Sequence, residues 1–241
     1  MSRQKKKRGT KREVLPVIVG NPMDPMGLNQ YMHRHLEWMQ IRNYAEPTLE
    51  KREFYLSFFI HWCDQRGLIR PGEITKPILE RYQRHLFHYR KKNGDPLSFR
   101  SQANRLVAIR AWFKWLTREN HILYNPASEI ELPKMEKRLP KAILSEREAE
   151  EVLSQPDLTQ PTGIRDRAIL ETLYSTGIRR MELTNLGIQD VDIDRGVVIV
   201  RQGKGKKDRV IPIGERAILW IEKYLNEVRP EQVCNIDDGH L

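Results

Sequence analysis

A proline-containing stretch near the middle of the chain constrains the fold more than any other feature. Pro126, Pro133 and Pro140 interrupt helical periodicity between two halves of different character. Prolines at this spacing favour an extended, semi-stiff connection, because each one fixes φ and removes a backbone donor. We therefore expect two domains. The expected parts are a basic flexible tail over residues 1–20, a helical domain over 21–120, a linker over 121–143 and a second domain over 144–241.

Charge is distributed unevenly between the two halves. Residues 1–143 contain 28 Lys and Arg against 14 Asp and Glu, whereas residues 144–241 contain 14 against 18. Seven of the basic residues lie in the first twelve positions, where no acid occurs. A positive field of this size indicates a polyanionic partner, most often nucleic acid. A contribution to solubility alone is the alternative.

The composition excludes several other classes of protein. With 39% hydrophobic and 31% charged residues, the chain has the composition of a globular protein. It contains no run of 18 apolar residues, so we expect no membrane span, and no apolar segment follows the basic N-terminus as in a secretory signal. Cys63 and Cys234 lie far apart, which suits a reducing compartment and offers no zinc-binding spacing.

Apolar periodicity predicts four helices in the first half, at about residues 26–42, 46–66, 75–92 and 98–119. One arc of the fourth helix is apolar and is expected to pack into a bundle. It consists of Leu106, Ile109, Trp112, Phe113 and Leu116. The opposite arc is basic and is formed by Arg100, Arg110, Lys114 and Arg118. This arc predicts a surface that follows a phosphate backbone, with an ordinary solvated face as the alternative.

The second half is predicted to combine helices with a small antiparallel sheet. Ser145 followed by Glu148 is a capping-box pattern, which starts a helix that ends before Pro156. Further helices are expected at residues 162–174, 179–186 and 217–226, and strands at 191–194, 197–200 and 209–213. The side chains expected to face the core include Tyr174, Ile218, Leu219, Ile221, Tyr224 and Leu225.

The first candidate site follows the helix that Gly177 is expected to end. Arg179 begins the next helix, and Glu182 lies three residues further on. A guanidinium stays charged and offers paired donors to two phosphoryl oxygens, and a helix N-terminus favours an anion. Glu182 can fix the orientation of Arg179 before a reaction begins. An exposed Arg–Glu pair with a purely structural role is the alternative.

The second candidate site is a glycine-flanked lysine at the predicted tip of a β-hairpin. Lys204 lies 25 residues after Arg179, between Gly203 and Gly205. Glycine permits a tight turn and a close approach of the backbone to a substrate, and a lysine there can protonate a departing oxygen. Taken alone, Gly-Lys-Gly is also typical of an exposed turn. The pattern of a nucleotide P-loop is absent.

Arg179 with Glu182, followed by the glycine-flanked Lys204, resembles the first arginine box and the hairpin lysine of the tyrosine recombinases, which include phage integrases and Xer-type recombinases. The resemblance implies a mainly α fold in two domains. The first would be a four-helix, SAM-like core-binding domain, and the second a mostly helical catalytic domain with a small antiparallel three-stranded sheet. It implies a site-specific recombinase that cuts and rejoins DNA strands through a phosphotyrosine.

The same resemblance implies roles for individual residues. Arg179 would contact the scissile phosphate, and Lys204 would act as the general acid for the leaving 5′ oxygen, with no metal or nucleotide cofactor. Duplex DNA would be clamped by both domains, with four protomers assembled on two sites in a bacterial cytoplasm, associated with the nucleoid. Besides the basic arc, three hairpin residues are expected to contact DNA: Lys206, Lys207 and Arg209.

The remaining residues of the family's site have no match before Leu241. These are a His-x-x-Arg box, a further His or Trp, and the nucleophilic tyrosine. We therefore expect a catalytically incomplete chain, either a fragment or a truncated gene product. The first alternative is a non-catalytic DNA-binding protein that occupies or regulates recombination sites. The second is a helical module whose basic face binds protein or RNA.

Overall fold

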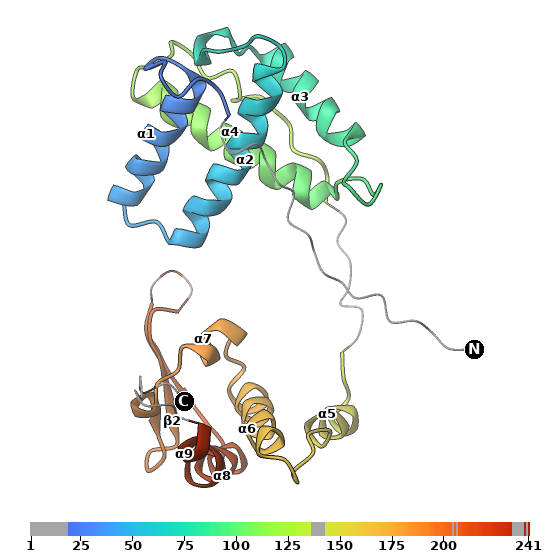
Figure 1. Ribbon diagram of the computed structural model, residues 1–241, viewed down its shortest axis with the longest axis vertical. Helices are drawn as coiled ribbons and strands as arrows, with labels where there is room; N and C mark the ends of the chain where they lie inside the picture. The colour runs from blue at the N-terminus through green and yellow to red at the C-terminus, as the bar shows by residue number, and fades with distance from the viewer. Residues whose placement is uncertain (1–18, 136–142, 204, 206, 233–238, 240) are drawn as a thin grey trace, which may run out of the picture. The chain divides into compact units, whose positions relative to one another are not determined.

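The computed structural model of the chain describes residues 19–135, 143–203, 205, 207–232, 239 and 241. The chain divides into two compact units, Met1–Arg138 and Leu139–Leu241 (Figure 1). Each unit has a hydrophobic core of its own. The fold is mainly helical with one small antiparallel sheet, as the sequence predicts. Within the described ranges, no helix is long and apolar enough to cross a membrane.

Four helices of the first unit pack together (Figure 1). They enclose a core rich in aromatic side chains. They are α1 (Leu28–Ile41), α2 (Glu46–Asp64), α3 (Lys76–His88) and α4 (Phe99–Arg118), with the short 3-10 turn η1 (Pro71–Glu73) after α2. Helix α4 contacts each of the other three. It begins where the Ser98 hydroxyl accepts a hydrogen bond from the Ser101 N–H at 3.2 Å. Its predicted apolar arc is buried, with Trp112 and Phe113 fully enclosed, so α4 is the central helix of this core.

Helix α3 ends four residues earlier than the sequence predicts. The chain leaves the helix at Tyr89, and Arg90 pairs with Pro96 in an isolated antiparallel bridge. Nη1 of Arg90 donates to the carbonyls of residues 87, 88 and 89 at 3.1–3.2 Å. These bonds satisfy carbonyl groups that another helical turn would otherwise occupy, and the turn at Gly94 then returns the chain toward α4.

In its described residues, the second unit combines five α-helices, one 3-10 turn and one π-helical turn with a three-stranded antiparallel sheet of order β1-β2-β3. Val198 of β2 pairs with Val191 on one side and Ile211 on the other, and its side chain is fully buried. The predicted capping box at Ser145 and Glu148 is present, with bonds of 2.8 and 3.3 Å. The elements are α5 (Glu146–Leu153), α6 (Pro161–Thr176), α7 (Arg180–Thr184), η2 (Ile188–Asp190), β1 (Val191–Asp192), β2 (Val197–Val200), β3 (Arg209–Pro212), α8 (Glu215–Lys223), the π-helical turn η3 (Tyr224–Val228) and α9 (Arg229–Gln232).

Two side chains of this unit that the sequence assigns to the core are exposed, which corrects that assignment. Tyr174 is 53% exposed and Leu219 is 64% exposed, whereas Tyr224 is half-buried. Helix α6 buries Ala168, Glu171 and Thr172. Tyr174 lies two residues beyond Thr172, so its side chain is rotated about 200° around the helix axis from that of Thr172. Helix α8 buries Ala217 and Ile221, which leaves Leu219 on the opposite side for the same reason.

Candidate active site

The predicted arginine lies at a sharply defined junction between α6 and α7. Gly177 ends α6 in the left-handed conformation, at φ 63° and ψ 17°, and its N–H donates to the Leu173 carbonyl at 3.0 Å. Ile178 follows with its side chain buried in the core of this unit. Arg179 is then the N-cap residue of α7, and its side chain is 58% exposed. The buried Ile178 side chain thus fixes the backbone, while the guanidinium of Arg179 stays accessible to solvent.

The Glu182 carboxylate binds both the backbone N–H and the guanidinium of Arg179. One carboxylate oxygen accepts from the Arg179 backbone N–H at 2.8 Å, and the other accepts from Nη1 of the same residue at 2.8 Å. The Glu182 side chain itself is only 8% exposed. The predicted pair at spacing i, i+3 is therefore present, and the shielded carboxylate holds an exposed arginine.

A second arginine, which comes from the sheet, binds the same carboxylate. Arg209 opens β3, and its Nη1 and Nη2 donate to the two oxygens of Glu182 at 3.0 and 2.6 Å. Such a bidentate pair is the strongest geometry that a guanidinium and a carboxylate can form. Hydrogen bonds from Arg209 and from the Arg179 backbone hold the pKa of the Glu182 carboxyl well below its usual range. The bond to Glu182 in turn raises the pKa of Arg209. Glu182 is therefore ionised throughout the physiological range.

The stem of the hairpin reaches this carboxylate through Gly203. A Cβ at this position would lie 2.6 Å from Nη1 of Arg209 and 3.0 Å from Oε1 of Glu182. The Gly203 N–H donates to the Lys207 carbonyl at 3.1 Å and closes the stem. Gly203 is thus packed closely against this ion pair, and a Cβ here would force the Arg209 guanidinium to shift. The close approach observed here is to a carboxylate of the protein itself, and the expected approach of the backbone to a substrate stays a prediction.

Of the three predicted hairpin lysines, the structure describes only Lys207. Lys204 and Lys206 lie outside the residues that the structure describes. Lys207 is exposed, and Gly205 adopts the turn conformation at φ 82°. The arginine box and the base of the hairpin are therefore side by side through Glu182, and the chemical role of Lys204 stays a prediction.

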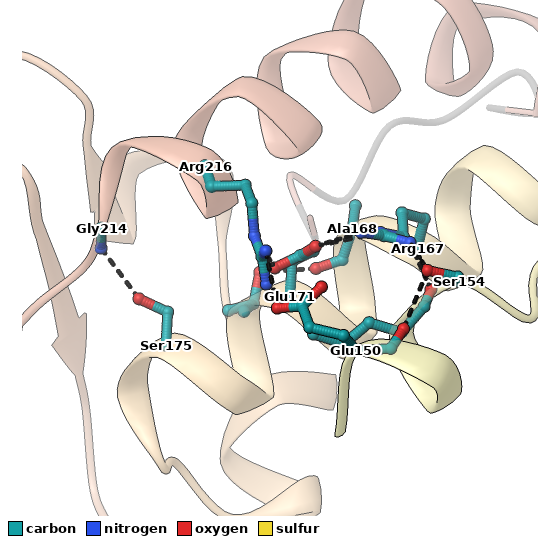
Figure 2. A network of polar contacts seen from close by, with 10 residues as sticks. Glu150, Ser154, Arg167, Ala168, Glu171, Ser175, Gly214 and Arg216 are labelled. Atoms are coloured by element: carbon teal, nitrogen blue, oxygen red, sulfur yellow. Dashed lines mark hydrogen bonds and ion pairs between the residues drawn. The ribbon is translucent and has the colours of Figure 1, made fainter. Parts of the chain in front are cut away.

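An ion-pair network centred on a buried carboxylate supports the helix that leads into Arg179 (Figure 2). The carboxylate of Glu171 is 2% exposed and accepts from Nε and Nη2 of Arg167 at 3.0 and 2.7 Å. Nε of Arg216, on α8, donates to the other oxygen at 2.9 Å, and Nη1 of Arg216 donates to Glu150 of α5 at 2.8 Å. Three helices are therefore joined by a network centred on one carboxylate. The sequence reasoning missed this network, although the i, i+4 spacing of Arg167 and Glu171 was a usable signal.

The basic arc of α4 is exposed as predicted at three of its four positions. Arg100, Lys114 and Arg118 are exposed, whereas Arg110 is half-buried. Arg110 and Lys114 line a shallow pocket of about 270 Å³ beside the segment that follows α4. The guanidinium of Arg118 lies 4.6 Å from the Trp38 ring centroid and pairs with Glu119 at 3.1 Å. The binding of DNA by this arc stays a prediction.

Comparison with known proteins identifies both units. Residues 31–122 match the family described as "Phage integrase, N-terminal SAM-like domain", and residues 142–236 match the "Phage integrase family". Tyrosine recombinase XerC 2 of Ralstonia nicotianae is 51% identical over 213 residues, which are 88% of this chain and 61% of that protein. Tyrosine recombinase XerC of Pelotomaculum thermopropionicum is 40% identical over 215 residues, which are 85% of this chain and 67% of that protein.

A solved structure supports the fold independently. The Tn1549 transposon integrase, in complex with a circular intermediate DNA, superposes with a TM-score of 0.66 at 19% identity, over 90% of this chain and 70% of that one. The chain spans about three-fifths of the length of the Ralstonia relative. On its sequence identity to the two Xer proteins and its matches to both domain families, the chain belongs to the tyrosine recombinases of the phage integrase family.

Proposed function

We propose that this chain binds duplex DNA and carries the arginine–lysine part of a site that cuts and rejoins DNA strands through a phosphotyrosine. The observation that carries the proposal is the exposed Arg179 held by the shielded Glu182 at the base of the hairpin that bears Lys204. Transfer of a phosphoryl group to a nucleophile builds negative charge on its oxygens. A guanidinium that is already oriented stabilises this charge without reorganisation.

In the proposed mechanism, Arg179 binds the scissile phosphate with the donors that Glu182 leaves available. Its Nε and Nη2 make no hydrogen bond to any residue within the described ranges. Lys204 protonates the leaving 5′ oxygen, and the nucleophile is a tyrosine of the complete site. The basic arc of α4, together with Lys206 and Lys207, follows the DNA backbone. The complete enzyme assembles as four protomers on two sites and acts in the cytoplasm on nucleoid DNA.

DNA binding is tested on the chain itself by fluorescence anisotropy at several salt concentrations. Replacing Arg110, Lys114 and Arg118 by Gln should weaken binding and reduce the slope of log K against log salt by about one for each phosphate that the variant no longer neutralises. A matched control removes the same charge from three arginines of the second unit, Arg147, Arg165 and Arg195. An unchanged slope in the first variant would place the DNA on another surface.

Strand cleavage is tested with a nicked suicide substrate, in an enzyme completed with the part of the Ralstonia relative that this chain does not span. Arg179→Ala should abolish the covalent protein–DNA adduct while duplex binding survives. Lys204→Ala should slow cleavage most where the leaving group is poor, and equal slowing on an activated leaving group would reject its role as an acid. Duplex binding without any adduct in the unmutated enzyme would favour a non-catalytic protein that occupies recombination sites.

A further inference from the structure

One carboxylate in this unit is shared by two arginines from different elements. Arg179 comes from the junction of α6 and α7, and Arg209 comes from β3, 27 residues beyond Glu182. Arg209 occupies both oxygens of Glu182, whereas Arg179 reaches it with one guanidinium nitrogen and its backbone N–H. Arg209 therefore makes the more extensive side-chain contact, and the orientation of Glu182 depends mainly on it.

The exposure of the three side chains follows the same order. The Glu182 side chain is 8% exposed, Arg209 is 36% exposed and Arg179 is 58% exposed. Gly203 closes the cluster from the hairpin side, because a side chain there would overlap with Nη1 of Arg209. A guanidinium whose two terminal nitrogens bind a shielded carboxylate is poorly placed to bind a phosphate as well. The Glu182 carboxylate therefore competes with DNA phosphate for the Arg209 guanidinium.

We infer that Arg209 is a positioning residue, which holds Glu182 and through it sets the orientation of the Arg179 guanidinium. The inference rests on the proposed function insofar as Arg179 is the phosphate-binding residue. Because Arg209 is also the first residue of β3, the stem of the hairpin and the arginine box keep one relative position. Displacement of the hairpin stem would carry Glu182, and with it Arg179, away from the phosphate.

The inference is tested by NMR of the arginine side chains and of the Glu182 carboxyl in the 241-residue chain without DNA. In Arg209→Gln, the Nε–H order parameter of Arg179 should fall to about 0.6 or below, the range of flexible groups. The pKa of Glu182 should rise by about one unit or more, because its strongest partner is removed. Arg209→Lys keeps the charge but not the planar fork, so it should loosen Arg179 while raising the pKa of Glu182 less.

The matched control is Arg201→Gln. Arg201 follows β2, and its Nε binds the 7%-exposed side chain of Asp190 at 2.6 Å without contacting Glu182. It should leave the Arg179 order parameter and the Glu182 pKa unchanged. The inference would be overturned if the Arg179 order parameter in both Arg209 variants equalled that of the parent chain. It would also be overturned if Arg201→Gln lowered this order parameter as much as the Arg209 variants do. If Arg209→Gln does not fold, Arg209→Lys alone carries the test.

A second titration separates the inference from the proposed function. A short mixed-sequence DNA duplex is added to the parent chain, and the Nε–H signal of Arg179 is followed. A shift of this signal supports phosphate binding by Arg179. An unchanged signal contradicts the proposed function but leaves the positioning of Arg179 by Arg209, measured without DNA, to stand or fall on its own result.

Discussion

Glu171 provides the sharpest test of what fixes the arginine box in the second unit. Its carboxylate is 2% exposed and accepts three hydrogen bonds, two from Arg167 and one from Arg216 (Figure 2). Glu171→Gln preserves the shape of the side chain but removes its charge and turns an amide NH₂ toward a guanidinium. Arg167, which is 12% exposed, is then left without its ionic partner in a shielded position.

The expected loss of stability follows from these exposures. Breaking a buried ion pair by changing one partner costs roughly 3–5 kcal/mol. Arg216 is 47% exposed, so solvent recovers part of the loss on that side, and we expect about 2–4 kcal/mol for Glu171→Gln. The matched control is Glu150→Gln, which removes a carboxylate that is 43% exposed and, among the described residues, is bound only by Arg216. It should cost less than about 1 kcal/mol.

Urea unfolding followed at the indole NMR signal of Trp220 measures this difference. Trp220 is the only tryptophan beyond position 115 and therefore reports on the second unit. With a slope of about 1–2 kcal/mol per molar urea for a unit of this size, a loss of 3 kcal/mol lowers the midpoint by roughly 1.5–3 M. A loss below 1 kcal/mol for Glu171→Gln, or one equal to the Glu150 control, would refute the idea that this carboxylate joins the three helices.

Three other positions give predictions of their own. Burial, and then the nearby arginines of the first unit, lower the pKa of His35 to about 4, so the folded state favours the neutral ring. The free energy of unfolding of the first unit should therefore fall by about 2 kcal/mol between pH 7.5 and pH 5, as the pH drops below the ordinary pKa of histidine. An equal loss in His35→Leu would contradict this assignment. Gly203→Ala, whose Cβ would lie 2.6 Å from Arg209, should cost about 1–3 kcal/mol in the Trp220 assay, and an unchanged midpoint would show that the pair can move aside freely. Gly177→Ala, at φ 63°, should cost about 1–2 kcal/mol and Gly177→Asn less, because asparagine tolerates the left-handed conformation; equal midpoints would exclude backbone strain as the cause.

Local patterns in the sequence were sufficient wherever the interacting groups lie within one helical turn. Ser98, the Ser145–Glu148 box and Gly177 mark helix ends because capping groups act within three or four residues. The pairing of Arg179 with Glu182 has the same origin, since residues at i and i+3 lie on one face. The apolar arc of α4 was also predictable, because its apolar residues recur at helical spacing along the sequence. The structure buries the Trp and Phe side chains of this arc in the unit's core.

The sequence by itself thus determined the helices, the sheet and the arginine with its local glutamate, and the resemblance of these motifs to a family indicated the function. Only the tertiary structure decided which polar groups are shielded and by what. Glu171 is buried because Arg216, 45 residues further on, binds the carboxylate oxygen that Arg167 on the same helix leaves unoccupied. Arg209 is committed to Glu182 from 27 residues away for the same reason. Burial of a charge depends on a partner that folding brings from a distant element, and periodicity along one helix contains no information about that partner.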